Sequence, residues 1–476
     1  MAPGHPFDPD LLDSVIKAYD VRGIVPDQFT PALATAIGAA FVEVLKIRVA
    51  DGGPGAVVVG QDMRDTGDEL VAAFADGVTS RGVDVVMLGC TSTDELYFAS
   101  GSRSLPGAML TASHNPAAYN GIKLCRAGAA PVGTDTGLAE IRHLVEQGVE
   151  HLAGPFEGTR GRLSTADVLA DYARFLRDLV PMADIRPLRV VVDAGNGMAG
   201  LTVPAVLGTD AGLPALPLTM HEMYFDLDGN FPNHEANPIE PENLRDLQAA
   251  VRTTGADLGL AFDGDADRCF VIDERGEPVS PSTITGLIAA RELQRVPGAT
   301  ILYNLICSRA VPEVIAEHGG QAVRTRVGHS YIKAEMARTG AIFGGEHSGH
   351  FYFADFWRAD SGLLAAMHVM AALGATPVGT GLSHMLTTYN RYVASGEINS
   401  VVSDVPAALE MIRQAYGGVD GVLVDELDGL TVTLPQGWFN LRPSNTEPLL
   451  RLNAEAADEP TMSAIRDEVL GRVRHT

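Results

Sequence analysis

Cysteine and positive charge are both scarce in this chain of 476 residues. The four cysteines form no CxxC motif and no paired spacing: Cys90, Cys125, Cys269 and Cys307. A disulfide framework requires paired cysteines, so the class of small disulfide-stabilised proteins is excluded. We expect reduced thiols, as in a cytoplasmic protein.

Lysine and arginine number 35 against 60 aspartate and glutamate residues, which leaves a net charge of −25. Nucleic acids and anionic membranes are bound through clustered basic side chains, so neither is expected as a partner. If the protein binds a phosphate group, its few cations must be concentrated at one place.

Long hydrophobic runs are absent as well, because no stretch of 18 apolar residues occurs. The longest candidate, residues 363–375, is short and contains His368, so we expect a buried helix there and not a membrane span. Asp8, Asp10 and Asp13 occupy the place where a signal peptide would need an apolar core. These features favour a cytoplasmic location.

Short β-branched runs alternate with helical patterns along most of the chain, as in parallel sheets built from βαβ units. Three of these runs resemble one another, and each ends in a polar or glycine-containing loop: residues 56–60, 188–192 and 299–303. Their wide spacing suits similar domains in tandem. The sequence therefore predicts an α/β fold with three similar domains of mixed or parallel sheets: residues 1–160, 161–277 and 278–388.

The last part of the chain, residues 389–476, has a different pattern. After a first strand, a helix is expected at 405–416 and a closing helix at 461–474, with three short strands between them: residues 421–424, 430–434 and 437–441. This order predicts a smaller C-terminal α+β domain.

The sharpest local motif is Asp-Gly-Asp-Ala-Asp-Arg at residues 263–268, directly after the apolar run 258–262. Three carboxylates spaced two residues apart converge on a hard divalent cation and leave coordination positions open for a phosphate oxygen, which suits Mg²⁺. An EF-hand calcium loop would need glycine where Arg268 stands, and a helix where residues 269–272 predict a strand. A solvated acidic turn is the remaining alternative.

A second motif, Thr-Ala-Ser-His-Asn-Pro at residues 111–116, is followed by Asn-Gly-Ile-Lys at 120–123. Ser113 comes just after an apolar run, so we expect it at the end of a strand, where it is a candidate nucleophile. The alternative is a serine that caps a helix or turn. No GxSxG motif surrounds it, so an α/β-hydrolase is not indicated.

Two further loops carry binding chemistry. Residues 442–448, Arg-Pro-Ser-Asn-Thr-Glu-Pro, offer a guanidinium fork, hydroxyls and backbone N–H groups to phosphate oxygens, or form an ordinary polar turn. Residues 344–350, Gly-Gly-Glu-His-Ser-Gly-His, place a carboxylate and a hydroxyl on a glycine-rich loop, which suits sugar hydroxyls. His347 and His350 are weak candidates for metal ligands, and structural histidines are the alternative.

In order and spacing, these four loops resemble the signature loops of the α-D-phosphohexomutases. Ala-Tyr-Asp-Val-Arg-Gly at 18–23 and Gly-His-Ser at 328–330 extend the resemblance to six motifs over essentially the whole chain. The resemblance implies domains arranged around a central cleft. It also implies that hexose 1- and 6-phosphates are interconverted through a phosphoserine, one Mg²⁺ and a hexose 1,6-bisphosphate activator.

The resemblance implies catalytic roles for single residues. Ser113 would be the phosphoserine, and it would share Mg²⁺ with three carboxylates: Asp263, Asp265 and Asp267. Three further side chains would lie around the reacting phosphate: Arg268, Lys123 and His114. His350 and His329 are preferred to Lys123 as the group that transfers protons.

Substrate contacts are implied for a further set of side chains that would line the same cleft: Tyr19, Arg22, Glu346, Ser348, Arg442, Ser444, Asn445 and Thr446. The last four would grip the non-reacting phosphate. Phosphoryl transfer depends mainly on positioning and charge neutralisation, so cations gathered around one serine are the expected parts. Ile306 departs from the pattern, because a lysine is expected there, and this puts one phosphate or sugar contact in question.

The loop 345–350 resembles the phosphomannomutase and dual mannose/glucose branches of the family more than the phosphoglucosamine branch. We expect mannose phosphates as main substrates with some glucose phosphate activity, because contacts to hydroxyls common to both sugars exclude neither strongly. A phosphoglucomutase, a metal-dependent sugar phosphatase and a non-catalytic sugar-phosphate-binding protein are the alternatives. Both a monomer and a homodimer are compatible with the sequence.

Overall fold

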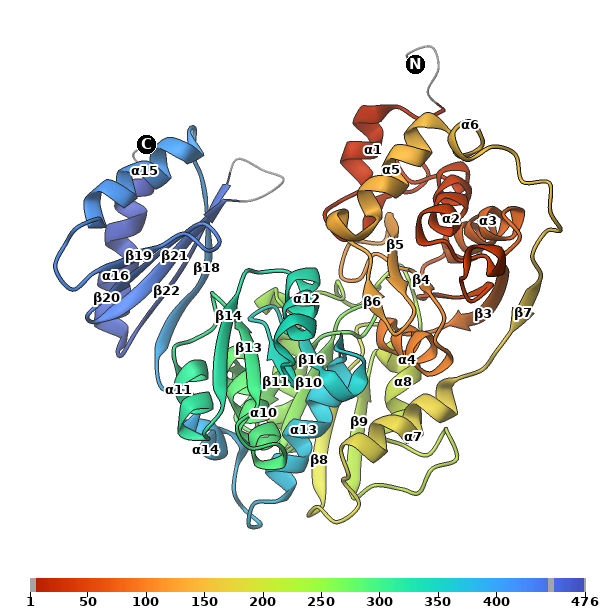
Figure 1. The fold of residues 1–476 in the computed structure, drawn as a ribbon. Coiled ribbons are helices and arrows are strands. Elements are labelled where there is room, and N and C mark those ends of the chain that lie inside the picture. Colours follow the sequence, from red (N-terminus) through yellow and green to blue (C-terminus); the bar gives the residue numbers. More distant parts are fainter. Residues whose placement is uncertain (1–5, 444–448, 475–476) are drawn as a thin grey trace. The chain divides into compact units, whose positions relative to one another are not determined.

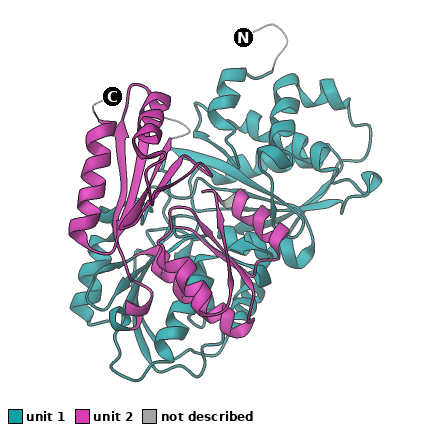
Figure 2. Ribbon diagram, turned by 60° about the vertical axis from the view of Figure 1, so that its left-hand side comes forward, with its two compact units in different colours: residues 1–279, 348–384 teal, residues 280–347, 385–476 magenta. Residues whose placement is uncertain are grey.

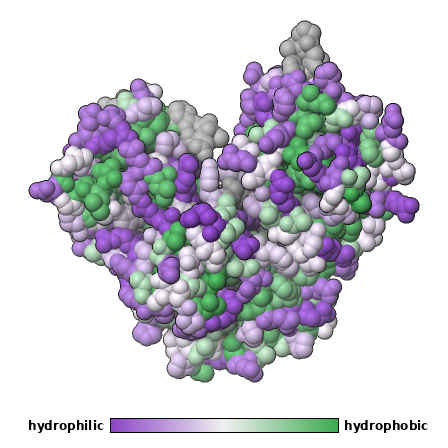
Figure 3. Space-filling view, viewed as in Figure 1, coloured by the Kyte–Doolittle hydropathy of each residue, from purple (hydrophilic) through white to green (hydrophobic). Residues whose placement is uncertain are grey.

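The computed structural model describes residues 6–443 and 449–474, apart from the side chains of His329 and Ser330. Figure 1 labels the helices and strands of the chain, which divides into the two compact units that Figure 2 shows in different colours. Unit 1 comprises Met1–Val279 and Ser348–His384, and unit 2 comprises Ser280–His347 and Met385–Thr476. Within the described ranges, no helix is both long and apolar enough to cross a bilayer. Hydrophilic and hydrophobic residues are interspersed on the face that Figure 3 shows.

Unit 1 begins with a mixed sheet in the strand order β1-β5-β4-β2-β3-β7, with β6 paired to β5. The pairs β2–β3, β2–β4 and β3–β7 are parallel, whereas β5 runs antiparallel to β1 and β4. The central strands β2 and β4 are mostly buried, as the β-branched run of β2 predicts, whereas β3 and β7 are more exposed. The strands are β1 (Val21–Ile24), β2 (Ala56–Gln61), β3 (Asp84–Cys90), β4 (Gly107–Leu110), β5 (Tyr119–Arg126), β6 (Ala130–Pro131) and β7 (Leu163–Thr165).

Side chains cap the N-termini of some of the helices around this sheet. Thr30 caps α2 by accepting a hydrogen bond from the Leu33 N–H, and Ser92 caps α4 in the same way through the Glu95 N–H. Helices α2 and α3 can approach closely because residue 77 is a glycine. A Cβ at this position would lie 2.0 Å from the Thr35 carbonyl oxygen. The helices are α1 (Pro9–Val15), α2 (Pro31–Leu45), η1 (Val49–Asp51), α3 (Gly67–Ser80), α4 (Thr93–Arg103), η2 (Thr134–Thr136), α5 (Leu138–Gln147) and α6 (Val149–Ala153).

The second sheet of unit 1 has the order β12-β11-β10-β8-β9, with β8 parallel to β9 and β10. Its strands are β8 (Leu188–Asp193), β9 (Leu218–Met223), β10 (Leu258–Phe262), β11 (Cys269–Asp273) and β12 (Pro278–Val279). Its helices are α7 (Leu169–Leu179), α8 (Ala199–Val206), η3 (Pro241–Leu244) and α9 (Arg245–Thr254). The later part of unit 1 holds β16 (Phe351–Phe353), η4 (Ala354–Phe356), β17 (Ala359–Asp360) and α13 (Gly362–Gly374), after which α14 (Leu382–Met385) leads into unit 2.

Unit 2 combines an α/β part with an antiparallel sheet. In the α/β part β13 runs parallel to β14 and β15. This part has α10 (Pro281–Arg295), β13 (Thr300–Asn304), α11 (Ala310–Glu317), β14 (Gln321–Thr325), α12 (His329–Thr339) and β15 (Phe343–Gly345). The antiparallel sheet has the order β18-β22-β21-β20-β19. Its region comprises η5 (Leu386–Thr388), β18 (Val393–Val401), α15 (Val405–Tyr416), β19 (Leu423–Asp425), β20 (Leu430–Leu434), β21 (Gly437–Pro443), β22 (Leu449–Ala456) and α16 (Glu459–Val473).

The predicted α/β fold with a C-terminal α+β part is confirmed. The three expected strands correspond to β2, β8 and β13, and the helix expected at 405–416 is α15. The apolar run 363–375 forms α13, which is buried along its whole length. The four cysteines are free, as expected. The four domain boundaries and the central cleft remain predictions.

Candidate active site

Ser113 lies in the loop between β4 and β5, three residues after β4 ends, and it begins no helix. Its side chain is buried, and its Oγ donates a hydrogen bond to Asp263 Oδ2 at 2.8 Å. His114 Nδ1 lies 3.2 Å from the same hydroxyl. The backbone of Ser113 is left-handed, with a φ of 50°, which costs a residue other than glycine about 1–2 kcal/mol. The expected position at a strand end is thus observed, and the hydroxyl points to the acidic loop.

The acidic loop connects β10 to β11, and its three carboxylates are all buried. One ligand oxygen from each of Asp263, Asp265 and Asp267 lies within 4.8 Å of the others. Asp265 Oδ2 accepts hydrogen bonds from Thr93 Oγ1 at 2.5 Å and from Lys123 Nζ at 2.6 Å. Lys123 Nζ also donates to Asp267 Oδ2 at 2.5 Å.

The remaining oxygens of this loop are suited to a metal ion. Within the described part of the chain, the Oδ1 atoms of Asp265 and Asp267 are buried and have no hydrogen-bond partner. A buried carboxylate oxygen without a donor is costly, and a hard cation with oxygen ligands removes that cost. The residues present therefore fit a divalent cation held by the three carboxylates.

Electrostatics lead to the same conclusion. Burial, together with the charge of Asp265, raises the pKa of Asp263 to about 6, and burial raises the pKa of Asp267 well above its usual range. Burial alone would also raise the pKa of Asp265, but the ammonium group of Lys123 lowers it. The raised pKa values show that Lys123 and Arg268 do not fully compensate three ionised carboxylates at this place, and a divalent cation would stabilise the ionised forms.

Arg268 connects the acidic loop to two histidines. Its Nε donates to His350 Nε2 at 3.2 Å, and its Nη2 lies 2.9 Å from His114 Nδ1. Burial and the neighbouring guanidinium group of Arg268 lower the pKa of His114 well below its usual value. His114 is therefore neutral, and its Nδ1 accepts the hydrogen bond from Arg268.

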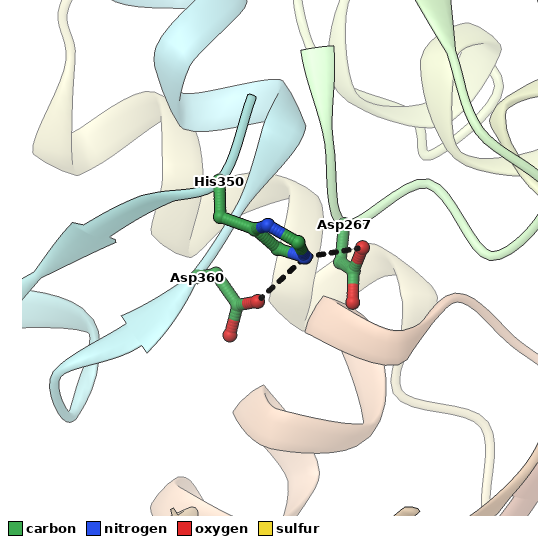
Figure 4. A group of neighbouring side chains, drawn as sticks. All are labelled: Asp267, His350 and Asp360. Carbon is green, nitrogen blue, oxygen red and sulfur yellow. Dashed lines mark ion pairs between the residues drawn. The ribbon is translucent and has the colours of Figure 1, made fainter. Parts of the chain in front are cut away.

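Figure 4 shows His350 between two carboxylates, Asp267 and Asp360. Its Nε2 is 3.7 Å from Asp267 Oδ1 and 3.9 Å from Asp360 Oδ2, and Ser348 Oγ is 2.9 Å from its Nδ1. These three side chains could also hold a metal ion. The guanidinium group of Arg268 occupies His350 Nε2, however, so a second cation there would meet a positive charge.

The two residues expected near the N-terminus lie on or beside β1. Arg22, on β1, donates to Asn115 Oδ1 at 2.5 Å and to Asp20 Oδ2 at 2.6 Å, so it contacts the loop of Ser113. Tyr19 is partly exposed. Lys123, on β5, contacts the carboxylates of the acidic loop and is held charged by them, because Asp265 and Asp267 raise its pKa although burial alone would lower it.

In unit 2, Glu346 follows β15 and is buried. Its Oε1 accepts hydrogen bonds from the Gly328 N–H at 3.0 Å and from Asn304 Nδ2 at 3.3 Å. Ile306 is buried as well, in the segment between β13 and α11. His329 begins α12, but its side chain is not among those described.

Arg442 lies at the end of β21, directly opposite Arg451 on β22. Both guanidinium groups face Glu397, at 3.5 Å and 3.2 Å. The Nε atoms of the two arginines are buried and have no hydrogen-bond partner among the described residues. The other expected members of this anion site lie outside the described residues: Ser444, Asn445 and Thr446.

Sequence reasoning missed Thr93, Arg451 and the pair Asp62 and Arg64. Arg64 follows β2 and donates to the Ser113 carbonyl at 2.9 Å. A usable signal was present: Asp62 and Arg64 directly follow a strand in a parallel pattern, and carboxyl ends of parallel strands meet at one edge of the sheet. Because β2 pairs in parallel with β4, that edge also carries Ser113.

Models of one protein family match nearly the whole chain. Four models of the phosphoglucomutase/phosphomannomutase family match in order: alpha/beta/alpha domain I at residues 13–151, domain II at 170–276, domain III at 281–392 and the C-terminal domain at 397–472.

Similar full-length proteins are known. A phosphomannomutase of Escherichia coli is 38% identical over 461 residues, which cover 96% of this chain and 98% of that protein. A phosphomannomutase/phosphoglucomutase of Pseudomonas syringae pv. tomato is 36% identical, with 96% and 94% covered. The crystal structure of a phosphoglucomutase/phosphomannomutase family protein from Burkholderia thailandensis gives a TM-score of 0.84 at 34% identity, with 96% and 97% covered. Since all four domain models match around a serine and an acidic loop in hydrogen-bond contact, the chain belongs to the phosphoglucomutase/phosphomannomutase family of phosphohexomutases.

Proposed function

We propose that this protein interconverts mannose 1-phosphate and mannose 6-phosphate, with some activity on the glucose phosphates. The observation that carries this proposal is the hydrogen bond from Ser113 Oγ to Asp263, beside two buried carboxylate oxygens that lack donors. The name of the E. coli relative supports mannose as the main sugar.

Asp263, Asp265 and Asp267 would hold Mg²⁺, which would neutralise charge on the phosphate of Ser113. In the forward reaction, the P–O bond to Ser113 Oγ breaks and a P–O bond to the free sugar hydroxyl forms, which yields the hexose 1,6-bisphosphate. The proton of that hydroxyl goes to a base. After the bisphosphate reorients, Ser113 Oγ takes the other phosphoryl group, and the proton returns to the sugar oxygen.

We assign the base to His350. Its Nε2 lies beside Arg268 and between the carboxylates of Asp267 and Asp360, so the ring stands next to the acidic loop that faces Ser113. Lys123 is a poor base, because Asp265 and Asp267 keep it charged. Its role, with that of Arg268, is to fix the carboxylates and to balance charge as the phosphoryl group moves.

The test follows mannose 1-phosphate and glucose 1-phosphate separately by phosphorus NMR, with Mg²⁺ and a trace of hexose 1,6-bisphosphate. We expect conversion to the 6-phosphates, faster with mannose. A Ser113→Ala variant should lose turnover by roughly 1,000-fold or more and still bind the sugar phosphate. Release of free phosphate would identify a phosphatase, and the absence of conversion would favour a binding protein.

A phosphomannomutase with equal use of both sugars is the second candidate. It is favoured by the name of the P. syringae relative, phosphomannomutase/phosphoglucomutase, which includes both activities. The same NMR measurement distinguishes the two candidates, because equal kcat/KM values for mannose 1-phosphate and glucose 1-phosphate would identify the dual enzyme.

A further inference from the structure

Arg64 is almost completely buried, at 3% exposed, although it belongs to none of the signature loops. It lies three residues after the end of β2. Burial of a charged guanidinium group requires hydrogen bonds for its N–H groups and a counter-charge. The contacts of Arg64 therefore indicate what it stabilises.

All five N–H groups of Arg64 have acceptors. Nε donates to Asp62 Oδ2 at 3.1 Å, and the other four donate to backbone carbonyls of the loop that contains Ser113 and of the first residue of β5. Those carbonyls belong to Ser113 (2.9 Å), Asn115 (2.7 Å), Pro116 (2.9 Å) and Tyr119 (2.8 Å). The planar fork of arginine can satisfy such a set, whereas the three donors of lysine cannot.

The same ion pair also fixes the other side of Ser113. The Ser113 N–H donates to Thr111 Oγ1 at 2.8 Å, and Thr111 Oγ1 donates to Asp62 Oδ2 at 2.7 Å. The N–H and the carbonyl of Ser113 are thus both connected to the pair of Asp62 and Arg64. Ser113 is the residue with the left-handed φ of 50°, a conformation that persists only where its surroundings impose it.

The other side of Arg64 is covered by the segment between β9 and η3. The ring of Phe231 lies 5.3 Å from the guanidinium carbon. Gly229 approaches so closely that an added Cβ would lie 2.6 Å from Arg64 Cα. Both neighbours keep Arg64 from solvent, so its guanidinium group contacts the loop and not a ligand.

We propose that Arg64 is a positioning residue for phosphoryl transfer, which holds Ser113 in its left-handed conformation with Oγ directed at the acidic loop. The proposal rests on the proposed function. Misplacement of a reacting group by about 1 Å is enough to cost roughly 100-fold in rate. Because the loss of Arg64 would misplace the reacting Ser113 and not the groups that bind substrate, we expect kcat to fall and KM to stay nearly unchanged.

The test compares Arg64→Lys with a matched control, Arg81→Lys. Arg81 is buried to a similar degree, at 4% exposed, and donates to Glu43 Oε1 at 2.6 Å and to the Gly154 carbonyl at 3.0 Å. We expect kcat to fall about 100-fold in Arg64→Lys with KM within about threefold, and no fall in kcat for folded Arg81→Lys. Equal kcat in the two variants, or a loss that only follows the folded fraction by circular dichroism, would overturn the proposal.

A second measurement does not depend on activity. Amide hydrogen exchange of residues 111–119 should become faster in Arg64→Lys than in Arg81→Lys, because Ser113 and its neighbours lose their anchor. Unchanged exchange would overturn the proposal even if the protein turned out not to be a mutase. Conversely, if exchange is faster in Arg64→Lys but the wild type shows no turnover, Arg64 still anchors the loop and only the proposed function is rejected.

Two further variants extend the test, and the first of them also applies where Arg64→Lys does not fold. Thr111→Val keeps the shape of the side chain and removes only the link from Asp62 to the Ser113 N–H, so kcat should fall about tenfold. In Arg64→Ala, millimolar guanidinium should partly restore kcat but should not do so in Ser113→Ala. Unchanged kcat in Thr111→Val, or loss of activity on adding guanidinium to Arg64→Ala, would count against the anchor.

Discussion

The two clusters of charged side chains that carry the proposed function differ in how they are held. Around Ser113, the three carboxylates are at most 1% exposed, and the side chains of Lys123 and Arg268 are 12% and 9% exposed. In unit 2, the side chains of Arg442, Arg451 and Glu397 are 15%, 34% and 31% exposed.

The difference follows from what each cluster would do. Groups that stabilise a transition state act most strongly when they are fixed and screened from water. A site that only grips a phosphate, and that must accept either end of a bisphosphate, gains more from access than from rigidity. Removal of a group from the buried cluster should therefore reduce kcat and metal binding, whereas removal from the exposed cluster should raise KM.

The largest effect is expected from Asp265→Asn. The variant replaces a carboxylate whose free oxygen fits a cation, and it also removes one partner of Lys123. We expect the affinity for Mg²⁺ to fall at least about 100-fold, with a matching loss of turnover at fixed Mg²⁺. Calorimetric titration with Mg²⁺ measures the first quantity, and Asp135→Asn, at an exposed carboxylate, is the control. Unchanged Mg²⁺ affinity would show that the acidic loop is a structural turn.

A smaller effect is expected from Arg442→Ala in the exposed cluster. Loss of a charge-assisted hydrogen bond to phosphate should raise KM about tenfold or more and change kcat little. Arg451→Ala should have a similar but weaker effect, since its side chain is more exposed. Arg466→Ala, on α16, is the control. A fall in kcat with unchanged KM would place Arg442 at the reacting centre and remove the contrast between the clusters.

The smallest effect is expected from a buried carboxyl group away from the serine hydroxyl. Glu95, near the start of α4, is buried, and burial raises its pKa to about 7. Between pH 4.5 and 7 the folded protein retains a proton that the unfolded chain releases, so the free energy of unfolding falls as pH rises through this range. Above pH 7 the penalty is constant.

Glu95→Gln should therefore be more stable than the wild type at pH 8 by about 1–2 kcal/mol, with the gain lost toward pH 5 and turnover unchanged. Denaturant unfolding at both pH values measures it. Glu69→Gln, at an exposed position in the first turn of α3, is the control. An equal stability difference at pH 5 and pH 8 would show that Glu95 does not titrate in this range. Burial also raises the pKa of Asp94 to about 6. Below that pH, the free energy of unfolding therefore still depends on pH in both the wild type and Glu95→Gln.

Much of the fold could be predicted from the sequence, because its signals are local. The helix at 405–416 and the strand at 430–434 were predicted with the bounds observed, since apolar periodicity and the flanking polar residues specify them. The closing helix begins two residues earlier than predicted, because Asp458 caps it by accepting from the Thr461 N–H. The acidic loop could be predicted because its signal is local too, since its three carboxylates lie within five consecutive residues, 263–267.

Other parts of the site could not be predicted, because they depend on contacts between distant segments. Thr93 contacts Asp265 across 172 positions of sequence, and Arg64 reaches the Ser113 carbonyl across 49. Neither residue type suggests such a role when it is considered alone. The position of Lys123 was predicted beside Ser113, and the structure places its ammonium group on Asp265 and Asp267.

By itself, the sequence determined the order of the elements and the acidity of the chain, and it indicated the candidate reacting groups, since these depend on residue type and on spacing along one segment. Tertiary structure alone decided which oxygen of each carboxylate is engaged and which lacks a donor. It also decided that the conformation of Ser113 is held by a buried arginine. The physical reason is that hydrogen-bond partners and burial, which fix orientation and charge, are supplied by strands and loops that become neighbours only when the sheets assemble.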